Sequence, residues 1–203
     1  MADATTINAK DVKDLRDKTG AGMMECKKAL QETGGDLEKA IDWLRAKGAA
    51  KAAKRADKSA NEGFIGSYVH FDGKTAVIVE LNCETDFVAN TEAFRALAKD
   101  LALHIASAAP LAVSSDQVDP AVVQREREIY LEQVRAEGKP DHIAGKIVEG
   151  KLQKFFKEFA LLAQPFVKDP DKTIEQLITD VSAKTGEKIE VARFARFKVG
   201  ERA

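Results

Sequence analysis

The chain has 203 residues, 44% of them hydrophobic and 32% charged, and this balance excludes a globally disordered protein. A formal net charge of −1 gives no overall attraction to nucleic acid or anionic lipid, so such binding would need a local patch. Two cysteines, Cys26 and Cys83, are too few for a disulfide framework. Because neither a signal-peptide pattern nor an apolar run of membrane-spanning length is found, we expect a cytoplasmic protein.

Residues 1–48 are predicted to form a separate domain of three short helices. Asn8 and Asp36 are typical N-caps, and Gly20 is a typical stop for the first helix. Such a small module has a thin core and is usually a binding domain. For Met23, Met24 and Trp43, packing is the default interpretation and a partner surface is the alternative. The apolar side chains at helical spacing are Val12, Leu15, Met23, Leu30, Leu37, Ala40, Ile41 and Leu44.

Residues 49–62 are predicted to be a basic, alanine-rich and helical linker. In and just before it, positive side chains recur every three or four residues and would form one stripe on a helix. The stripe is either a solvated face or a patch for an acidic partner or RNA. No aromatic residue lies among these side chains to stack on a base, so we expect no direct nucleic-acid binding. The stripe consists of Lys47, Lys51, Lys54, Arg55 and Lys58.

Residues 63–203 are predicted to form an α+β domain with a three-stranded antiparallel sheet packed with helices. Two strands, over 63–71 and 74–82, are joined by Asp72-Gly73, which predicts a type I′ hairpin turn. The alternation from Ile189 onward predicts the third strand. Phe194, Phe197 and Val199 then lie on a sheet with one face short of cover, which a second copy of the chain would supply.

Four helices are predicted between the hairpin and the last strand, over 91–110, 119–138, 140–162 and 173–186. Asp119-Pro120 is a cap followed by proline at the first helical position, and Thr173 with Gln176 is typical of a capping box. The third of these helices is expected to bury five apolar side chains. They are Ile143, Ile147, Phe155, Phe159 and Leu162.

The segment from Asn82 to Asn90 connects a strongly β-patterned run to a helix, and such connections often carry function. It places the apolar ring of Phe87 beside the carboxylate of Asp86. One interpretation is that Phe87 packs inward and Asp86 caps the next turn. The other is that the ring is exposed and is used to bind a partner.

No pattern for catalysis is found. His70, His104 and His142 are scattered, without metal-ligand spacing, and are interpreted as ordinary surface or half-buried histidines. The run 145–151 has the spacing of a phosphate-binding loop, but Leu152 stands where Ser or Thr would hold magnesium and the segment has a helical pattern. We therefore interpret the protein as a non-enzyme with no catalytic residue, metal site or cofactor.

Two long motifs resemble the bacterial elongation factor Ts family. They are Lys-Thr-Gly-Ala-Gly-Met-Met-Glu-Cys-Lys-Lys-Ala-Leu at 18–30 and Asn-Cys-Glu-Thr-Asp-Phe-Val-Ala at 82–89, and the runs 138–140, 148–151 and 164–167 resemble further stretches. The resemblance implies a guanine-nucleotide exchange factor for GDP-bound elongation factor Tu, with an N-terminal domain similar to ubiquitin-associated domains. Longer members have two sheet-bearing half-modules and a helical hairpin insert. This chain has room for one module and resembles the short form, which is associated with homodimers.

The resemblance also implies roles for individual residues. Thr85, Asp86, Phe87 and Val88 match the segment that dislodges Mg²⁺ from the partner. The residues expected to contact the partner are Met23, Met24, Lys27, His70 and Asn82. The alternative is a ubiquitin-associated-like adaptor whose α+β domain only scaffolds partners.

Overall fold

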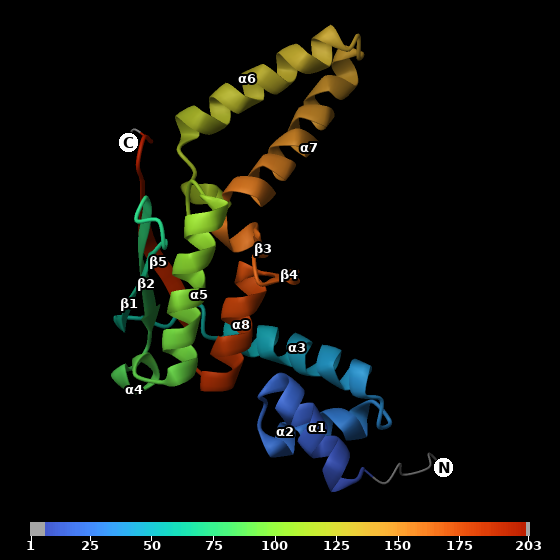
Figure 1. Cartoon of the computed structure of the whole chain (residues 1–203). Coiled ribbons are helices and arrows are strands. Elements are labelled where there is room, and N and C mark those ends of the chain that lie inside the picture. Colours follow the sequence, from blue (N-terminus) through green and yellow to red (C-terminus); the bar gives the residue numbers. More distant parts are fainter. Residues whose placement is uncertain (1–6, 202–203) are drawn as a thin grey trace. The chain divides into compact units, whose positions relative to one another are not determined.

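The computed structural model describes residues 7–201, so the predicted domain ends at 1 and 203 lie outside the described residues (Figure 1). The fold is α+β, as predicted. The chain divides into two compact units. The first comprises the residues up to Gly63 together with Asn82–Arg95 and Ile178–Glu190. The second comprises Phe64–Leu81, Ala96–Leu177 and the chain from Val191.

The first unit begins with three helices, α1 (Ala9–Thr19), α2 (Met23–Glu32) and α3 (Leu37–Ala53). The Asn8 side chain accepts a hydrogen bond from the backbone N–H of Asp11, and Asp36 accepts one from Lys39, so both predicted N-caps are confirmed. Gly20 ends α1 with a φ of 68°, a conformation in which glycine avoids the strain of a side chain.

The core of these three helices is small and almost entirely aliphatic. Trp43 packs against it, whereas Met23 and Met24 are exposed, so the default interpretation of packing is confirmed for Trp43 and was wrong for the two methionines. The exposed side of α2 therefore carries a methionine pair, Met23 and Met24, that the three-helix core does not use. The buried core residues are Val12, Leu15, Cys26, Ala29, Leu30 and Ala40.

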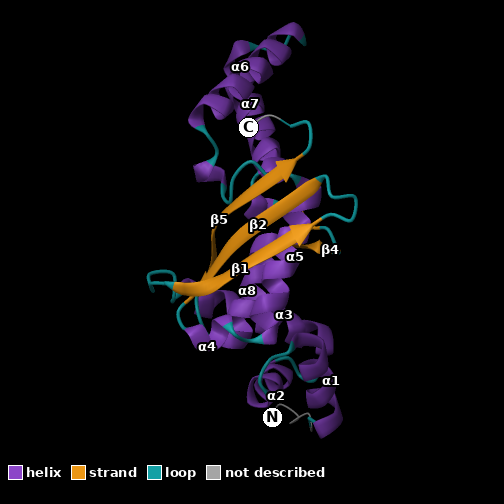
Figure 2. Ribbon diagram, turned by 60° about the vertical axis from the view of Figure 1, so that its left-hand side comes forward, coloured by secondary structure: helices purple, strands orange, loops and turns teal. Residues whose placement is uncertain are grey.

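The strands β1 (Glu62–Val69), β2 (Thr75–Cys83) and β5 (Ile189–Lys198) form the predicted antiparallel sheet in the order β1-β2-β5 (Figure 2). The predicted hairpin is present, but its turn is not type I′. The His70 N–H donates to the Thr75 carbonyl (2.8 Å), which leaves a four-residue loop, and of its residues only Gly73 has a positive φ. Type I′ needs positive φ at two successive positions, and the longer loop removes that requirement from Asp72.

The two faces of the sheet differ sharply. Helix α5 (Glu92–Ala108) lies on one face, and Gly66 approaches it so closely that a Cβ there would stand 2.6 Å from the Ala98 carbonyl oxygen. The other face exposes Ile65, Val69 and Ile78. The sequence predicted such an uncovered face. Phe197 is exposed, but Phe194 is three residues away, so alternation places it on the opposite face, where it is half-buried.

Helices α6 (Pro120–Ala136) and α7 (Asp141–Phe159) form a helical hairpin within the second unit (Figure 1). Asp119 caps α6 as predicted. The hairpin has its own buried cluster of Val134, Ala144, Val148 and Leu152. Ile143 was expected in this core but is exposed, because the inward positions of this turn are taken by Ala144 and Ile147.

A two-stranded ribbon of β3 (Pro165–Phe166) and β4 (Asp169–Thr173) follows the hairpin and was not predicted. Both strands are short and contain a proline, Pro165 in β3 and Pro170 in β4, so neither has the alternating pattern by which a strand is predicted. Helix α8 (Ile174–Thr185) then begins with the predicted capping box, in which Thr173 and Gln176 exchange hydrogen bonds of 3.0 and 3.2 Å. Short 3₁₀ turns occur at Ser115–Gln117 and Leu161–Ala163.

His104 is fully buried in the second unit, so its interpretation as a surface or half-buried residue was wrong. Its Nε2 lies 2.9 Å from the Gln164 side-chain oxygen, and the Val167 N–H donates to its Nδ1 at 3.4 Å. Only a neutral imidazole protonated at Nε2 satisfies both contacts. Burial lowers the pKa of His104, which favours the same neutral form.

Candidate partner-binding loop

The candidate site is the short connection between β2 and α5, which contains the four-residue helix α4 (Asp86–Ala89). Thr85 is the N-cap of α4, and its Oγ1 accepts a 3.4 Å hydrogen bond from the Val88 N–H. The prediction that Asp86 caps this turn was therefore wrong by one residue. Thr85 keeps the extended backbone of a cap, whereas Asp86 is already in the first helical turn.

Phe87 is 82% exposed, so the interpretation that its ring packs inward was wrong. Val88 and Ala89 are buried in the same turn and anchor it, and Asp86 lies on the exposed side with the ring. A single helical turn cannot bury all of its side chains, and here the two smaller apolar ones are inside. The largest apolar side chain of the loop is left to solvent, which is unusual unless a partner covers it.

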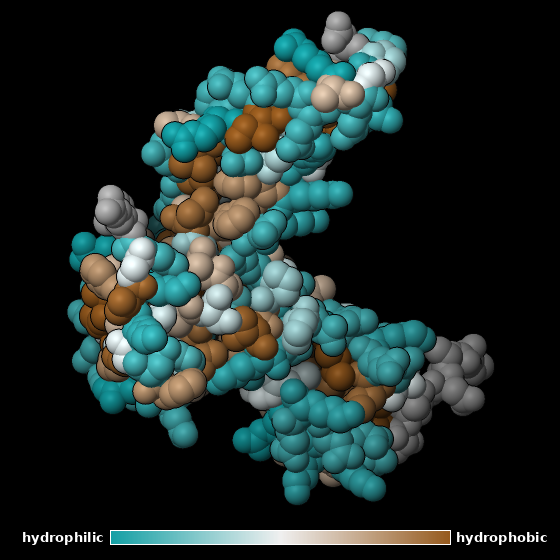
Figure 3. Space-filling model, turned by 45° about the horizontal axis from the view of Figure 1, so that its top comes forward, coloured by the Kyte–Doolittle hydropathy of each residue, from teal (hydrophilic) through white to brown (hydrophobic). Residues whose placement is uncertain are grey.

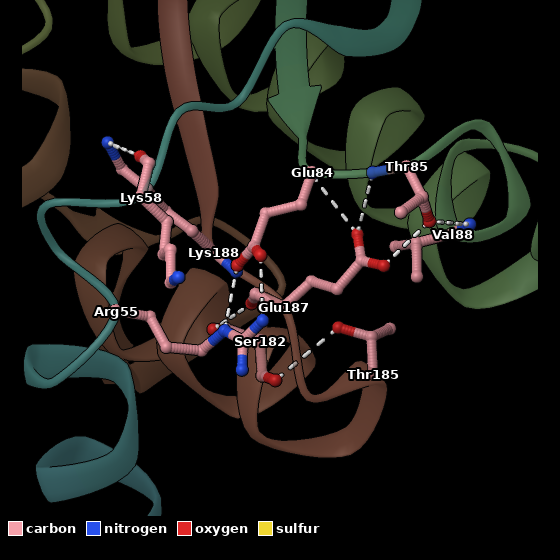
Figure 4. Close-up of polar contacts among 9 residues, drawn as sticks. All are labelled: Arg55, Lys58, Glu84, Thr85, Val88, Ser182, Thr185, Glu187 and Lys188. Carbon is pink, nitrogen blue, oxygen red and sulfur yellow. Dashed lines mark hydrogen bonds and ion pairs between the residues drawn. The ribbon is translucent and has the colours of Figure 1, made fainter.

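The backbone of the loop is fixed by the carboxylate of Glu187, a residue that is distant in sequence (Figure 4). The Glu187 carboxylate accepts hydrogen bonds from the backbone N–H groups of Glu84 (3.1 Å) and Thr85 (3.0 Å). The Thr85 hydroxyl donates to the same carboxylate at 2.6 Å. These three contacts hold both residues that precede α4, and hence the direction in which the turn points.

Glu84 makes the matching contacts in return. Its carboxylate binds the Arg55 guanidinium through two hydrogen bonds of 2.7 Å and accepts the Lys188 N–H at 2.7 Å. These hydrogen bonds, with that of Arg55 the strongest, lower the pKa of Glu84 to about 2. The Lys188 ammonium donates to the Lys58 carbonyl at 3.1 Å. The loop is thus joined both to the turn after α8 and to the linker after α3 (Figure 4).

Cys83 lies directly below the loop and is fully buried. Its thiol donates to the Thr85 carbonyl at 3.1 Å, and burial raises the pKa of the thiol. Cys83 is therefore a neutral packing residue that supports the loop.

The other predicted contact residues are not gathered at the loop. Met23, Met24 and Lys27 lie on α2, where all three side chains are exposed. Asn82 is a partly buried residue of β2. His70 lies in the second unit, half-buried, with its Nδ1 2.9 Å from the Tyr68 hydroxyl and its ring 4.4 Å from that of Phe71.

Part of the basic stripe is paired within the chain, since Glu25 and Glu84 bind three of its five positive side chains. Lys47 and Lys51 both form ion pairs with Glu25, and together they lower the pKa of Glu25, with the Lys51 hydrogen bond the strongest cause. Arg55 is engaged by Glu84. Lys54 is exposed.

Sequence reasoning missed Glu187, Glu84 and Arg55 as parts of the site. Glu84 stands inside the long motif, but Arg55 and Glu187 are 29 and 102–103 residues from their contacts in the loop. One signal was available: Glu187 directly follows Gly186, whose positive φ of 75° turns the chain away from the axis of α8. Among residues 7–201, no group of three or more His, Cys, Asp or Glu side chains has the arrangement of a metal site.

Comparisons with known proteins decide the family. The family profile described as "Elongation factor TS" matches residues 4–201. The chain belongs to the elongation factor Ts family. It is 55% identical over 194 residues to an elongation factor Ts from Nitratidesulfovibrio vulgaris (strain DSM 19637 / Miyazaki F), a match that covers 96% of this chain and 97% of the relative.

Other elongation factor Ts relatives are equally similar over their length. The protein of Thermosipho melanesiensis (strain DSM 12029 / CIP 104789 / BI429) is 55% identical, with 96% of this chain and all of the relative covered. That of Geotalea daltonii (strain DSM 22248 / JCM 15807 / FRC-32) is 53% identical, with 97% and 91% covered. The matches therefore cover at least 91% of each of these relatives. Within the described residues, no helix combines the length and apolarity needed to cross a membrane.

Proposed function

We propose that this protein binds GDP-bound elongation factor Tu and accelerates the release of GDP, so that GTP can bind. Membership of the elongation factor Ts family supports the translational role. The observation that carries the exchange role is the loop at 85–88, which displays the Phe87 ring to solvent while hydrogen bonds fix the backbone beneath it. A preorganised, exposed aromatic side chain is a typical hot spot of a protein interface.

The proposed mechanism is competition between two ligands of the partner. Insertion of Phe87, with Asp86 beside it, would displace the partner's elements that hold Mg²⁺ and the phosphates. By linkage, the factor then weakens nucleotide binding by the same factor as the nucleotide weakens binding of the factor. A nucleotide held at nanomolar strength has about 12 kcal/mol of binding free energy, so one ring cannot displace it alone. Further contacts must contribute.

We assign these further contacts to Met23, Met24 and Lys27 on α2, and to His70 and Asn82. The exposed methionine pair gives α2 an adaptable apolar surface, and Lys27 adds a positive charge on the same helix. Residues 1–48 would then act as a separate gripping domain. Consistent with this, the three helices have a hydrophobic cluster of their own.

The test is release of a fluorescent GDP analogue from elongation factor Tu. The intact protein should accelerate release, and Phe87→Ala should slow the accelerated reaction by roughly 30-fold, since a buried aromatic anchor is commonly worth about 2 kcal/mol or more. Lack of acceleration by the intact protein would favour the adaptor alternative, in which elongation factor Tu is bound without loss of nucleotide. A matched control is Phe64→Leu, which changes a half-buried phenylalanine outside the loop.

We further propose that the protein is a homodimer joined through the uncovered face of the sheet. Ile65, Val69 and Ile78 expose aliphatic side chains there, and Phe71, Phe197 and Val199 extend the apolar surface. Figure 3 shows hydrophobic surface near the C-terminal end of the described chain. Two such sheets packed face to face would bury these side chains. Sedimentation at micromolar concentration should give a dimer that Ile78→Glu converts to a monomer, and a monomeric wild-type protein would refute this.

A further inference from the structure

We propose that Glu187 is a positioning residue for nucleotide exchange: its carboxylate sets the direction in which Phe87 is presented. The inference rests on the proposed function and extends it to a residue that is far from the loop in sequence. The Glu187 carboxylate accepts hydrogen bonds from Glu84 and Thr85, which directly precede the turn that carries the ring. The Glu187 residue is partly buried.

The geometry is that of a reciprocal clamp, which we define as Glu84, Thr85, Glu187 and Lys188. Glu187 receives the backbone N–H groups of residues 84 and 85, while Glu84 receives the backbone N–H of residue 188. Each segment therefore donates its backbone to the other segment's carboxylate (Figure 4). A slide of one segment along the other would break hydrogen bonds at both carboxylates, so the clamp permits a single register.

The clamp also fixes the start of α4. The Thr85 hydroxyl donates to Glu187 and, through the same oxygen, accepts the Val88 N–H. Glu187 thus determines the rotamer of Thr85, and Thr85 caps the turn in which Phe87 stands. A four-residue helix has no intrinsic stability, so its orientation depends on this cap and on the burial of Val88 and Ala89.

On the other side, Glu187 is itself held in place. The Ser182 hydroxyl donates to the Glu187 carbonyl, which fixes the backbone of the turn that follows α8. The Arg55 guanidinium balances the carboxylate of Glu84 and ties the clamp to the linker after α3. The carboxylate of Glu187 therefore stands on a rigid support, as a positioning group must.

The experiment is a double-mutant cycle of Glu187→Ala and Phe87→Ala, read by the saturating rate of fluorescent-GDP release from elongation factor Tu. Because a small misplacement of an acting group can cost up to about 100-fold, we expect Glu187→Ala alone to slow release by at least about tenfold. If Glu187 acts through the ring, it should cost less than about twofold once Phe87 is already alanine. Equal costs in both backgrounds would overturn the inference.

Two readouts separate positioning from mere stability. Glu187→Ala should reduce the hydrogen-exchange protection of the Glu84 and Thr85 amides at a temperature where the variant remains folded. Glu187→Gln keeps an oxygen that can accept both N–H groups, so it should recover most of the rate. Should the alanine variant fail to fold, the same cycle is run with Glu187→Gln and Glu187→Asp, and a rate that ignores side-chain length would refute positioning.

Glu128→Ala is the matched control, since it removes an exposed carboxylate of α6 that accepts a hydrogen bond from Gln124 and is not a member of the clamp. Its release rate should equal that of the wild-type protein, and a loss as large as that of Glu187→Ala would indicate a general charge effect and overturn the proposal. The failures are distinguishable. If Phe87→Ala alone leaves release unchanged, the proposed function of the ring fails. If Phe87→Ala slows release and Glu187→Ala does not, only the role of Glu187 fails.

Discussion

The polar cluster around Glu187 and the polar cluster around His104 contain similar hydrogen bonds but differ in what these bonds support. At the candidate site, the carboxylate of Glu187 binds backbone N–H groups beneath a ring that is 82% exposed. Around His104, the buried side chains of His104 and Gln164 bind each other and backbone groups of the second unit. A hydrogen-bond network alone thus says little about function. The cluster around Glu187 differs because its hydrogen bonds hold the turn that exposes the apolar ring of Phe87 to solvent.

The largest expected effect compares two phenylalanines seven residues apart. Phe94 is fully buried, so Phe94→Ala should lower the free energy of unfolding by about 3–5 kcal/mol through loss of burial and a residual cavity. Phe87→Ala removes an exposed ring and should change it by less than about 0.5 kcal/mol. Urea denaturation of both variants measures this. A Phe87→Ala variant as unstable as Phe94→Ala would mean that the ring packs inward in solution.

The next largest effect is expected for Gln164→Leu, which tests whether the cluster around His104 serves only stability. In Gln164→Leu, the His104 Nε2–H and the Glu158 carbonyl oxygen lose their partner, and the buried His104 group left unpaired costs about 1–3 kcal/mol. Gln133→Leu on exposed α6 is the matched control and should be nearly neutral. Equilibrium unfolding compares the two, while nucleotide release at a temperature where both are folded should be unchanged. A slowed release for Gln164→Leu would contradict the division between the clusters.

The sequence predicted part of the candidate site, namely Phe87, but none of the cluster around His104. Periodicity and caps were sufficient for most of the helices and for the three strands, because each signal is local. The linker predicted to be helical over 49–62 is helical only as far as Ala53. The long motif identified Phe87, but residue type alone could not decide whether the ring is buried, since phenylalanine is usually buried. The sequence could not predict that Glu187 binds the loop or that His104 pairs with Gln164. Their contacts span 102–103 and 60 residues and follow from tertiary packing.

A smaller effect on the free energy of unfolding is expected when the pH is lowered, because His104 is buried. Burial lowers the pKa of His104, so below the ordinary value near 6.5 the unfolded chain binds a proton that the folded chain resists. Stability should therefore be complete above that pH and fall as the pH drops below it, because protonation would turn the acceptor of the Val167 N–H into a donor. Urea denaturation between pH 7.5 and 5.5 tests the sign. His142→Gln, which changes an exposed histidine, should leave the slope unaltered, and a flat profile for the wild-type protein would contradict the assignment.

The smallest effect separates the two exposed side chains of the loop. Asp86 is exposed and forms no part of the clamp, and a rim carboxylate contributes about 0.2–1 kcal/mol, so Asp86→Ala should slow GDP release at most about fivefold. Because a charge acts through a field that salt screens, this loss should shrink between 0.05 and about 0.5 M salt, whereas the loss from Phe87→Ala should persist. Asp86→Asn keeps the shape without the charge and should behave as the alanine variant does. If Asp86→Ala instead slows release more than Phe87→Ala, then the carboxylate disturbs the partner's Mg²⁺ site and the ring serves only to place it there.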